Sequence, residues 1–390
     1  MVSFWIILFS LALLSLLYTY LFYPLLMRAL AKGKNLKVSD YNLKEVQKAT
    51  VIIAAYNEED VIENTLSKIK ESLNFNKLEI LVGSDGSTDN TNKIVEHFAL
   101  DNSNVNLYKF ERKGKVAILN ALIQNAKNEL VVLMDANIEV SVDCLPNVLK
   151  HFADENIGLV GANIKNITNE NQLAKDVSTF EDAYINNENE LKYNEGVVFG
   201  SMMGPFGGCY ALRRNLYQRI PENFLVDDFY ICMKVLKQNK KAVLAKNAWC
   251  YEHLTSTFAS EFKRKRRISA GNFQNLMVFK SLLLKFKNSV GFTFFSHKIL
   301  RWKGPFLFGW CLVSSAMLFN FHPFFKSMFL GMAPVLLIPL LNWVLYKLKI
   351  RIPLMQKVAY FILMNFALLV GFVDWMTGIK SGIWQPTKRK

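Results

Sequence analysis

Hydrophobic positions from residue 50 onward follow two alternating patterns. Short runs rich in β-branched and other apolar residues are typical of buried strands, and each is followed by a stretch with apolar residues every three or four positions, which predicts a helix. The predicted strands are 50–55, 78–83, 104–110, 130–134 and 157–162. Strands that alternate with helices form βαβ units with right-handed connections. We therefore predict an α/β domain with a Rossmann-like, mostly parallel sheet.

The pattern changes after residue 200. Residues 204–214 (GPFGGCYALRR) form a glycine-rich stretch that leads into a short strand or helix. Residues 226–245 (VDDFYICMKVLKQNKKAVLA) predict a helix that starts near the two aspartates, followed by another strand. We assign these elements to the same domain.

Long apolar segments occur at both ends of the chain. Residues 4–26 are long enough to cross a bilayer. No basic region precedes them and no small-residue cleavage site follows, which favours a retained transmembrane helix over a signal peptide. Residues 304–321, 327–346 and 355–376 are also apolar, with tryptophans near their ends. One such segment alone could be a buried core helix, but three in succession favour a membrane bundle.

These patterns divide the chain into five parts. They are an N-terminal transmembrane helix, an α/β domain, an interfacial amphipathic segment that mixes lysines with apolar residues, C-terminal transmembrane helices and a basic tail. Their boundaries are 1–27, 48–275, 276–302, 303–378 and 379–390.

The basic charge of the chain fits a membrane better than a nucleic acid. The formal net charge is +15, and many basic residues flank the apolar segments. That arrangement follows the positive-inside rule and predicts a multi-pass protein of the cell membrane with its large middle region in the cytoplasm. We expect no nucleic-acid partner. The flanking residues are Arg28, Lys32, Lys34, Lys37, Lys347, Lys349 and Arg351.

The basic tail conflicts with this topology. Three C-terminal crossings would place it outside, against the rule, so either one segment does not cross fully or the tail violates the rule. The tail residues concerned are Lys380, Lys388, Arg389 and Lys390. The five cysteines show no metal-ligand spacing, and in a cytoplasmic domain they are expected to be free thiols.

Two of the predicted strands end in aspartate. Asp85 lies in GSDGSTDNT (83–91), and Asp135 lies in LMDANIEV (133–140). Ligands of open α/β sheets bind in the crevice at the carboxyl ends of the strands. A carboxylate there can bind a ribose or base edge, or hold a divalent cation against a diphosphate. Neither a G-x-G-x-x-G dinucleotide motif nor a G-x-x-x-x-G-K-[ST] phosphate loop is present in the sequence.

Together with AAYNEED (54–60) and VDD (226–228), these motifs resemble the family 2 glycosyltransferases in order and spacing. Members of this family are inverting enzymes that use nucleotide sugars and have the GT-A fold. The resemblance covers roughly residues 50–300. It implies nucleotide-binding roles for strand-end and basic residues, with a solvated helix-start lysine as an equal alternative for Lys115. These residues are Ala55, Tyr56, Glu58, Asp85, Lys115 and Asp135.

The family's D-x-D metal motif corresponds to Asp135-Ala136-Asn137 in this chain. The resemblance therefore implies Mg²⁺ or Mn²⁺ at Asp135 and Asn137. An asparagine carbonyl can ligate either ion but supplies no charge, so we expect weaker metal binding than two aspartates would give.

The resemblance also implies roles on the acceptor side and in catalysis. VDD corresponds to an acidic motif whose last aspartate, here Asp228, is the general base. The alternative is a carboxylate that only stabilises a helix start, where we expect a low pKa. The glycine-rich loop resembles the family's acceptor-side loop, or is a structural turn. The implied acceptor-binding residues are Gly207, Gly208, Cys209 and Asp227.

RKRRI (264–268) resembles the family's Q/R-x-x-R-W motif. Arg264 and Arg267 occupy the arginine-type positions and would bind the diphosphate, whereas Ile268 replaces the tryptophan. The alternative is a basic patch on anionic lipid. Loss of the tryptophan weakens the case for long-chain polymerisation.

The sequence thus predicts a membrane-anchored, hexosyltransferase-type enzyme. It would move a sugar from a UDP-sugar to a saccharide or lipid-linked acceptor for envelope or extracellular polysaccharide. One alternative is a processive synthase that also exports its product; the predicted helices are few for a channel, although a homo-oligomer such as a dimer could build one. The other is a catalytically weak membrane scaffold of the same fold, suggested by Asn137 and Ile268.

Overall fold

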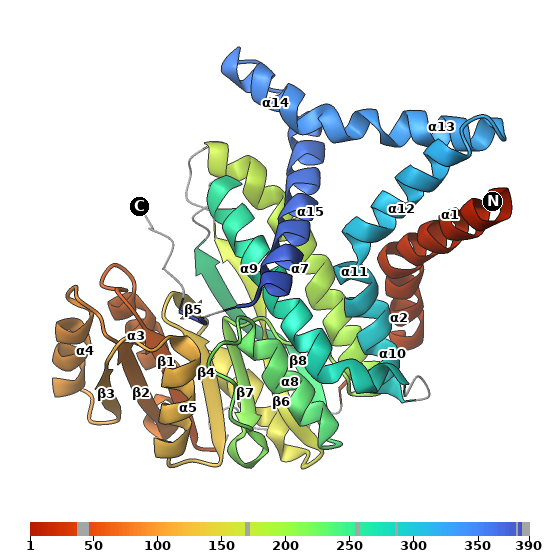
Figure 1. Ribbon diagram of the computed structural model, residues 1–390. Coiled ribbons are helices and arrows are strands. Elements are labelled where there is room, and N and C mark those ends of the chain that lie inside the picture. Colours follow the sequence, from red (N-terminus) through yellow and green to blue (C-terminus); the bar gives the residue numbers. More distant parts are fainter. Residues whose placement is uncertain (37–46, 168–171, 254–257, 285–287, 380, 384–390) are drawn as a thin grey trace. The chain divides into compact units, whose positions relative to one another are not determined.

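The computed structural model describes residues 1–36, 47–167, 172–253, 258–284, 288–379 and 381–383 (Figure 1). The chain divides into two compact units. The helical unit comprises Met1–Leu26, Lys175–Phe180 and Ser256–Gly378, and the α/β unit comprises Met27–Ala174, Glu181–Thr255 and Ile379–Lys390. Among the basic residues named above, Lys37, Lys380, Lys388, Arg389 and Lys390 lie outside the described residues.

The α/β unit contains an eight-stranded sheet in the order β3-β2-β1-β4-β7-β6-β8-β5. Its first half is parallel, because β1 pairs with β2 and β4, and β2 pairs with β3. β7 then runs antiparallel to β4 and β6, β6 is parallel to β8, and β5 is antiparallel to β8. The predicted mostly parallel sheet is confirmed. The strands are β1 (Ala49–Ala55), β2 (Leu78–Asp85), β3 (Val105–Phe110), β4 (Leu130–Asp135), β5 (Ile138–Val140), β6 (Ile157–Ile167), β7 (Cys209–Arg213) and β8 (Lys241–His253).

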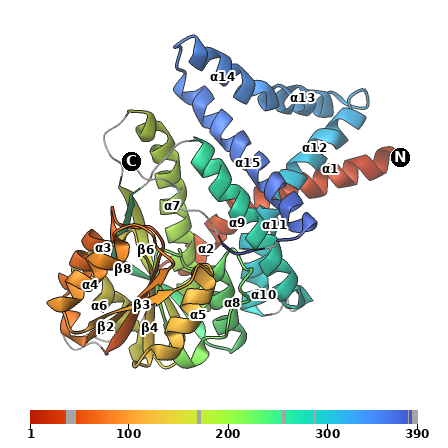
Figure 2. The same cartoon turned by 60° about the vertical axis from the view of Figure 1, so that its left-hand side comes forward.

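Helices cover both faces of this sheet (Figure 2). α3 (Ile62–Lys70), α4 (Thr91–Leu100) and α6 (Cys144–Leu149) lie on one face. α5 (Lys115–Asn125) and α8 (Asp227–Lys237) lie on the other. The long helix α7 (Gln172–Phe199) precedes the glycine-rich loop. The site described below draws on the ends of β1, β2 and β4, the starts of α5 and α8, and the glycine-rich loop.

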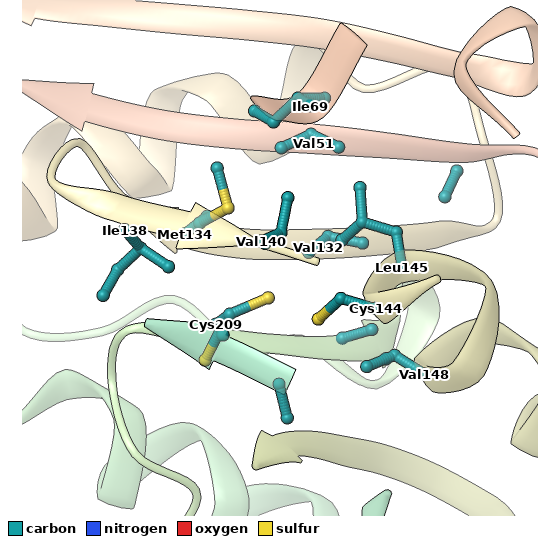
Figure 3. Packing of buried hydrophobic residues seen from close by; sticks show 14 of the residues in the cluster. Val51, Ile69, Val132, Met134, Ile138, Val140, Cys144, Leu145, Val148 and Cys209 are labelled. Carbon is teal, nitrogen blue, oxygen red and sulfur yellow. The ribbon is translucent and has the colours of Figure 1, made fainter. Parts of the chain in front are cut away.

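The core depends on the alternation of side chains along the strands. Val51, Val132 and Met134 point to the face that carries α3 and α6, where they pack with Leu145 and Val148 (Figure 3). Each such fully buried aliphatic side chain contributes about 1.5–3 kcal/mol relative to exposure.

The opposite face shows why one strand position is glycine. A Cβ atom on Gly83 would lie 2.8 Å from Leu122 Cδ1 and closer still to Ile118, both on α5. Glycine therefore lets α5 approach β2 closely. This packing places the start of α5, and with it Lys115, beside the carboxyl ends of the strands.

Among the described residues, three helices that lie largely or wholly in the helical unit are long and apolar enough to cross a membrane: Val2–Ala31, Pro323–Lys347 and Pro353–Thr377. The first comprises α1 (Val2–Leu17), a π-helical segment and α2 (Tyr23–Ala31). The second includes α13 (Pro323–Met332) and α14 (Ile338–Lys347), and the third is α15. α12 (Gly304–Met317) is apolar but has only 14 residues, which span about 21 Å. A bilayer core is about 30 Å thick, so α12 is short for a crossing.

Two helix pairs organise this unit. α12 packs on α1 through Leu307 and Cys311 against Phe9 and Ala12. α9 (Phe258–Phe279) packs along α15, where the absence of a side chain at Gly371 lets the backbone of Arg266 approach. Short helical segments follow α9, namely α10 (Ser289–Thr293) and α11 (Leu300–Trp302) with a π-helical segment between them. The predicted interfacial position of this region stays a prediction.

All five cysteines are free and buried, as expected for a reduced protein. Three of them, Cys144, Cys209 and Cys250, belong to the core of the α/β unit.

Candidate functional site

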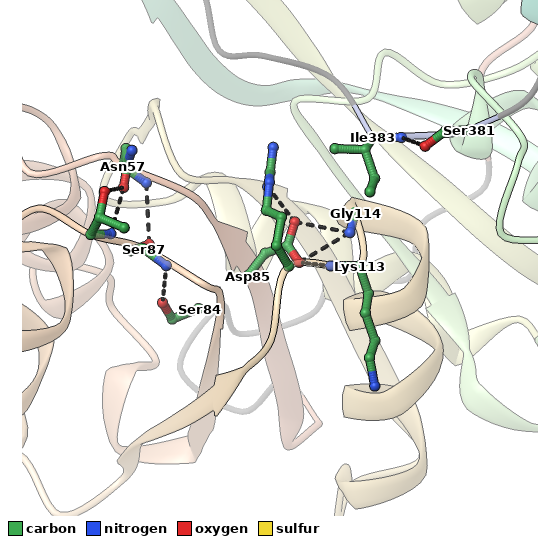
Figure 4. Close-up of polar contacts among 10 residues, drawn as sticks. Asn57, Ser84, Asp85, Ser87, Lys113, Gly114, Ser381 and Ile383 are labelled. Atoms are coloured by element: carbon green, nitrogen blue, oxygen red, sulfur yellow. Dashed lines mark hydrogen bonds and ion pairs between the residues drawn. The ribbon is translucent and has the colours of Figure 1, made fainter.

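Asp85 lies at the carboxyl end of β2 and organises the turn that leads into α5. Its Oδ1 accepts hydrogen bonds from the backbone N–H groups of Lys113 (2.7 Å) and Gly114 (3.0 Å) (Figure 4). Its Oδ2 forms an ion pair with the Arg112 guanidinium. Gly114 has a φ of +94°, which favours glycine at this turn. Asp85 is thus held by three donors in succession along the chain.

Arg112 connects Asp85 to the loop that follows β1. Its guanidinium carbon lies 3.3 Å from the centre of the Tyr56 ring, a stacked cation–π contact. Arg112 belongs to none of the sequence motifs described above. Tyr56 directly follows Ala55, the last residue of β1. These contacts bring a tyrosine, an arginine and an aspartate together at the carboxyl edge of the sheet.

The loops after β1 and β2 are also joined by hydrogen bonds. The Asn57 N–H donates to Ser87 Oγ (3.1 Å), and Asn57 Oδ1 accepts from the Thr88 N–H (2.8 Å) (Figure 4). The Glu58 N–H donates to Thr91 Oγ1 at the start of α4 (2.9 Å). The predicted nucleotide-binding residues of these two loops therefore share one edge of the sheet, although their contact with a nucleotide stays a prediction.

Lys115, the first residue of α5, lies among aspartates from two other elements. Its Nζ is 2.7 Å from Asp135 Oδ1 at the end of β4 and 3.5 Å from Asp227 Oδ2 at the start of α8. Burial would lower the pKa of Lys115, but Asp135 and Asp227 outweigh it, and the pKa is raised above its ordinary value. Lys115 is therefore a permanent cation here rather than a solvated lysine at a helix start.

Asp228 follows Asp227 in the first turn of α8. The Phe229 N–H donates to its Oδ1 (2.7 Å). Burial and the neighbouring Asp227 raise the pKa of Asp228 to about 6, although Lys115, the Phe229 N–H and Lys192 pull it downward. The expectation of a low pKa at this helix start was wrong, because desolvation and a like charge outweigh the helix dipole. A pKa of about 6 suits a general base that acts near neutral pH.

The glycine-rich loop passes directly beside this carboxylate. A Cβ atom on Gly207 would lie 3.2 Å from Asp228 Oδ2, so glycine keeps the space next to that oxygen open. The next residue, Gly208, accepts a hydrogen bond from the Asp135 N–H through its carbonyl oxygen (3.0 Å). Cys209 begins β7, and its side chain lies in the core, where it contacts Cys144. Any contact of Cys209 with an acceptor is thus left to its backbone.

The oxygen ligands near Asp135 fit a divalent cation whose coordination shell is completed by the oxygens of a diphosphate. Asp135, Asp227, Asp228 and Lys115 together carry a net charge of −2 when all are ionised. The Asp135 side chain is 36 % exposed. Asn137 directly precedes β5. Within the described residues, no group of three His, Cys, Asp or Glu side chains could hold a metal alone. Magnesium sites commonly use one or two carboxylates together with substrate phosphates, which matches this donor set.

Arg264 and Arg267, the two arginines of RKRRI that are predicted to bind the diphosphate, belong to α9 in the helical unit. Arg264 Nε donates to Glu261 one turn earlier, at 3.1 Å. Arg266, which lies between Arg264 and Arg267 in the sequence, forms an ion pair with Asp374 of α15. Diphosphate binding by Arg264 and Arg267 stays a prediction.

Comparisons with known proteins agree with this geometry. Residues 50–220 match the family model described as Glycosyl transferase family 2. Poly-beta-1,6-N-acetyl-D-glucosamine synthase of Staphylococcus aureus (strain MSSA476) is 32 % identical over 146 residues, 37 % of this chain and 35 % of that protein. The synthase of the same name from Staphylococcus epidermidis is 30 % identical over 147 residues, 36 % of this chain and 34 % of that protein. The matched part is thus about a third of the length of these curated relatives.

One solved structure resembles nearly the whole chain. The mannosyltransferase PcManGT from Pyrobaculum calidifontis, in complex with GDP-Man and Mn²⁺, aligns with a TM-score of 0.66 over 95 % of this chain and 99 % of its own. The sequence identity is 20 %, so the likeness concerns the fold. It confirms the predicted GT-A-type α/β fold with additional apolar helices.

Proposed function

We propose that this chain, whose residues 50–220 form a glycosyl transferase family 2 domain, transfers a sugar from a nucleotide-sugar donor to a saccharide or lipid-linked acceptor. The observation that carries the proposal is the cluster of Asp135, Asp227 and Asp228 around Lys115 beside the Gly207 loop. A partly buried carboxylate with a pKa of about 6 next to an open glycine is suited to an acceptor hydroxyl.

In this proposal Asp228 accepts the proton of the acceptor hydroxyl. The acceptor oxygen then forms a bond to the anomeric carbon as the bond from that carbon to the diphosphate oxygen breaks. The nucleoside diphosphate leaves with the bonding electrons, and the sugar inverts its configuration. Lys115 lies where it can offset the negative charge that develops on the leaving group, the kind of fixed electrostatic stabilisation that enzymes use most.

A divalent cation, Mg²⁺ or Mn²⁺, would be held by Asp135 and Asn137. When bound, it would neutralise the diphosphate as a Lewis acid. Asn137 adds no charge, so of these two residues only Asp135 would be an ionic ligand of the cation. The substrate phosphates would supply the remaining negatively charged ligands.

We propose a UDP-sugar as the donor and envelope or extracellular polysaccharide as the product. The names of the curated relatives, which are poly-N-acetylglucosamine synthases, support a saccharide product. Tyr56 and Arg112 are suited to the nucleoside end, because an aromatic ring and a guanidinium can both stack on a base. Because these names describe synthases of a polymer, they also favour a second candidate function, processive synthesis.

The experiment that tests the proposal incubates detergent-purified protein with Mn²⁺ and a panel of nucleotide sugars that includes UDP-N-acetylglucosamine, UDP-glucose and GDP-mannose. We expect release of UDP with at least one UDP-sugar. Chain lengths of the product separate single addition from processive synthesis. No release with any donor would contradict the proposal and favour a catalytically weak scaffold.

We further propose that the α/β unit and the C-terminal tail lie on the same, cytoplasmic side of the membrane. The described residues of the tail, 379 and 381–383, belong to the α/β unit, where Gly382 contacts the backbone oxygen of Glu222. Ile383 Cγ1 lies 3.3 Å from the Cβ position of Gly114. This packing supports an even number of crossings between α9 and the tail, which the helices Pro323–Lys347 and Pro353–Thr377 would supply without α12.

This topology can be tested by introducing single cysteines into the protein and labelling them in membrane vesicles. Lys390→Cys places a thiol in the tail, and Leu100→Cys is the matched control because Leu100 of the α/β unit is 81 % exposed. The native cysteines are buried and should react slowly. We expect an impermeant maleimide to label both variants in inverted vesicles only. Labelling of Lys390→Cys from the opposite side to Leu100→Cys would contradict the even number of crossings.

A further inference from the structure

A buried lysine of α7 contacts the loop that passes the general base. Lys192 is 3 % exposed, and its Nζ lies 3.4 Å from the centre of the Phe206 ring. Phe206 directly precedes Gly207, which lies beside Asp228. A buried ammonium needs compensating interactions, and the Phe206 ring is among the partners of Lys192. None of the motifs of the sequence includes it.

The next turn of α7 forms a hydrogen bond with Met203, at the other end of the same loop. Glu195, fully buried, accepts a hydrogen bond from the Met203 N–H at Oε2 (3.0 Å). Between these two contacts, Gly204 has a φ of +81° and lies against the Phe229 ring, next to Asp228 in α8. α7 therefore contacts both ends of residues 203–206, through Glu195 at Met203 and through Lys192 at Phe206.

We propose that Lys192 is a positioning residue for sugar transfer: through Phe206 it fixes the Gly207 loop against Asp228, and its charge favours the ionised form of Asp228. This inference rests on the proposed function, in which Asp228 is the general base.

The charges around Asp228 explain why one ammonium matters. Burial and the carboxylate of Asp227 raise the pKa of Asp228, and Lys115 and Lys192 are the side-chain cations that lower it. Lys115 is already shared with Asp135 and Asp227. Removing Lys192 would leave the carboxylates with less compensation, so the pKa of Asp228 would rise further. The groups that face this region are Asp227 and Tyr230 of α8, Lys115 of α5, Asp135 of β4, Tyr210 of β7, Tyr217 after β7, and Lys192 and Glu195 of α7.

The test compares the pH profile of kcat for the wild type, Lys192→Met and Lys192→Arg. Methionine keeps an unbranched chain on Phe206 without charge, whereas arginine keeps the charge and can stack on the ring. For Lys192→Met we expect the acidic limb to move upward by about half to one pH unit. At pH 6 that shift lowers the rate roughly two- to sixfold relative to the wild type, and above pH 8 the loss is smaller. Lys192→Arg should restore the wild-type limb.

A purely structural role would give a different result. In that case Lys192→Met lowers kcat by the same factor at every pH, or only lowers the melting temperature, and the inference is wrong. Lys192→Gln is a second neutral variant with the same expected shift, should the methionine variant fold poorly.

Asp228→Asn is measured in parallel. A normal rate in Asp228→Asn refutes the proposed function itself. Loss of activity there, combined with an unshifted limb in both neutral variants of Lys192, refutes only the role of Lys192.

Discussion

Asp228→Asn is expected to lower sugar transfer by roughly 10²–10⁴-fold while nucleoside diphosphate binding stays near wild type. Asparagine keeps the size of the side chain and can still accept a hydrogen bond from the Phe229 N–H. It cannot take the proton of the acceptor hydroxyl. Turnover assays beside calorimetric titration with UDP separate the chemical step from binding.

Asp143→Asn is the matched control. Asp143 also stands at a helix start, before α6, where it accepts hydrogen bonds from Ser141 Oγ and Asn147 Nδ2. That change should cost about 1 kcal/mol of stability or less and leave the rate nearly unchanged. If Asp228→Asn behaves like this control, Asp228 is only a helix-start carboxylate.

The same assignment fixes the pH dependence of the wild type. Burial and Asp227 raise the pKa of Asp228 to about 6, and only the ionised form can accept a proton. The rate should therefore rise as pH increases through about 6 and level off above it. An acidic limb near pH 4, the ordinary range of a solvated carboxyl, would show that Asp228 does not limit the reaction.

Removal of divalent cations is expected to abolish transfer, and added Mg²⁺ or Mn²⁺ to restore it. Lys115 balances only one of the three carboxylates Asp135, Asp227 and Asp228, and the arriving diphosphate adds further negative charge. A bound cation is therefore needed to neutralise the leaving group. EDTA treatment followed by metal titration measures this dependence. Full activity in EDTA would contradict the metal assignment.

Asn137→Asp provides the matched variant for that experiment. It adds an ionic ligand two residues after Asp135, so the Mn²⁺ concentration for half-maximal activity should fall. Asp135→Asn should raise that concentration or abolish activity. An unchanged metal requirement in both variants would place the cation elsewhere.

The strand-end residues were predictable because their signals are local. Asp85 and Asp135 each end a strand rich in apolar residues, and parallel strands bring their carboxyl ends to one edge. Asp227 and Asp228 similarly mark the start of an amphipathic helix. Such patterns need no knowledge of distant contacts.

Other features depend on contacts between distant parts of the chain. Lys192 reaches the site only because α7 packs against the Phe206 loop, and Arg112 only because β3 lies next to β2. The pKa of Asp228 was misjudged for the same reason, since its burial is not visible in the letters VDD. The apolar run at 304–321 likewise forms a shorter helix, which ends at Met317.

Transfer of an isotope-labelled sugar tests the central claim most directly. Purified protein is incubated with Mn²⁺ and the labelled donor that gave nucleotide release, and the product is examined by NMR. We predict that the label enters a saccharide or lipid-linked product with the opposite anomeric configuration to the donor, and that Asp228→Asn forms almost none. Label found only in free sugar, or in a product with retained configuration, would contradict an inverting glycosyltransferase.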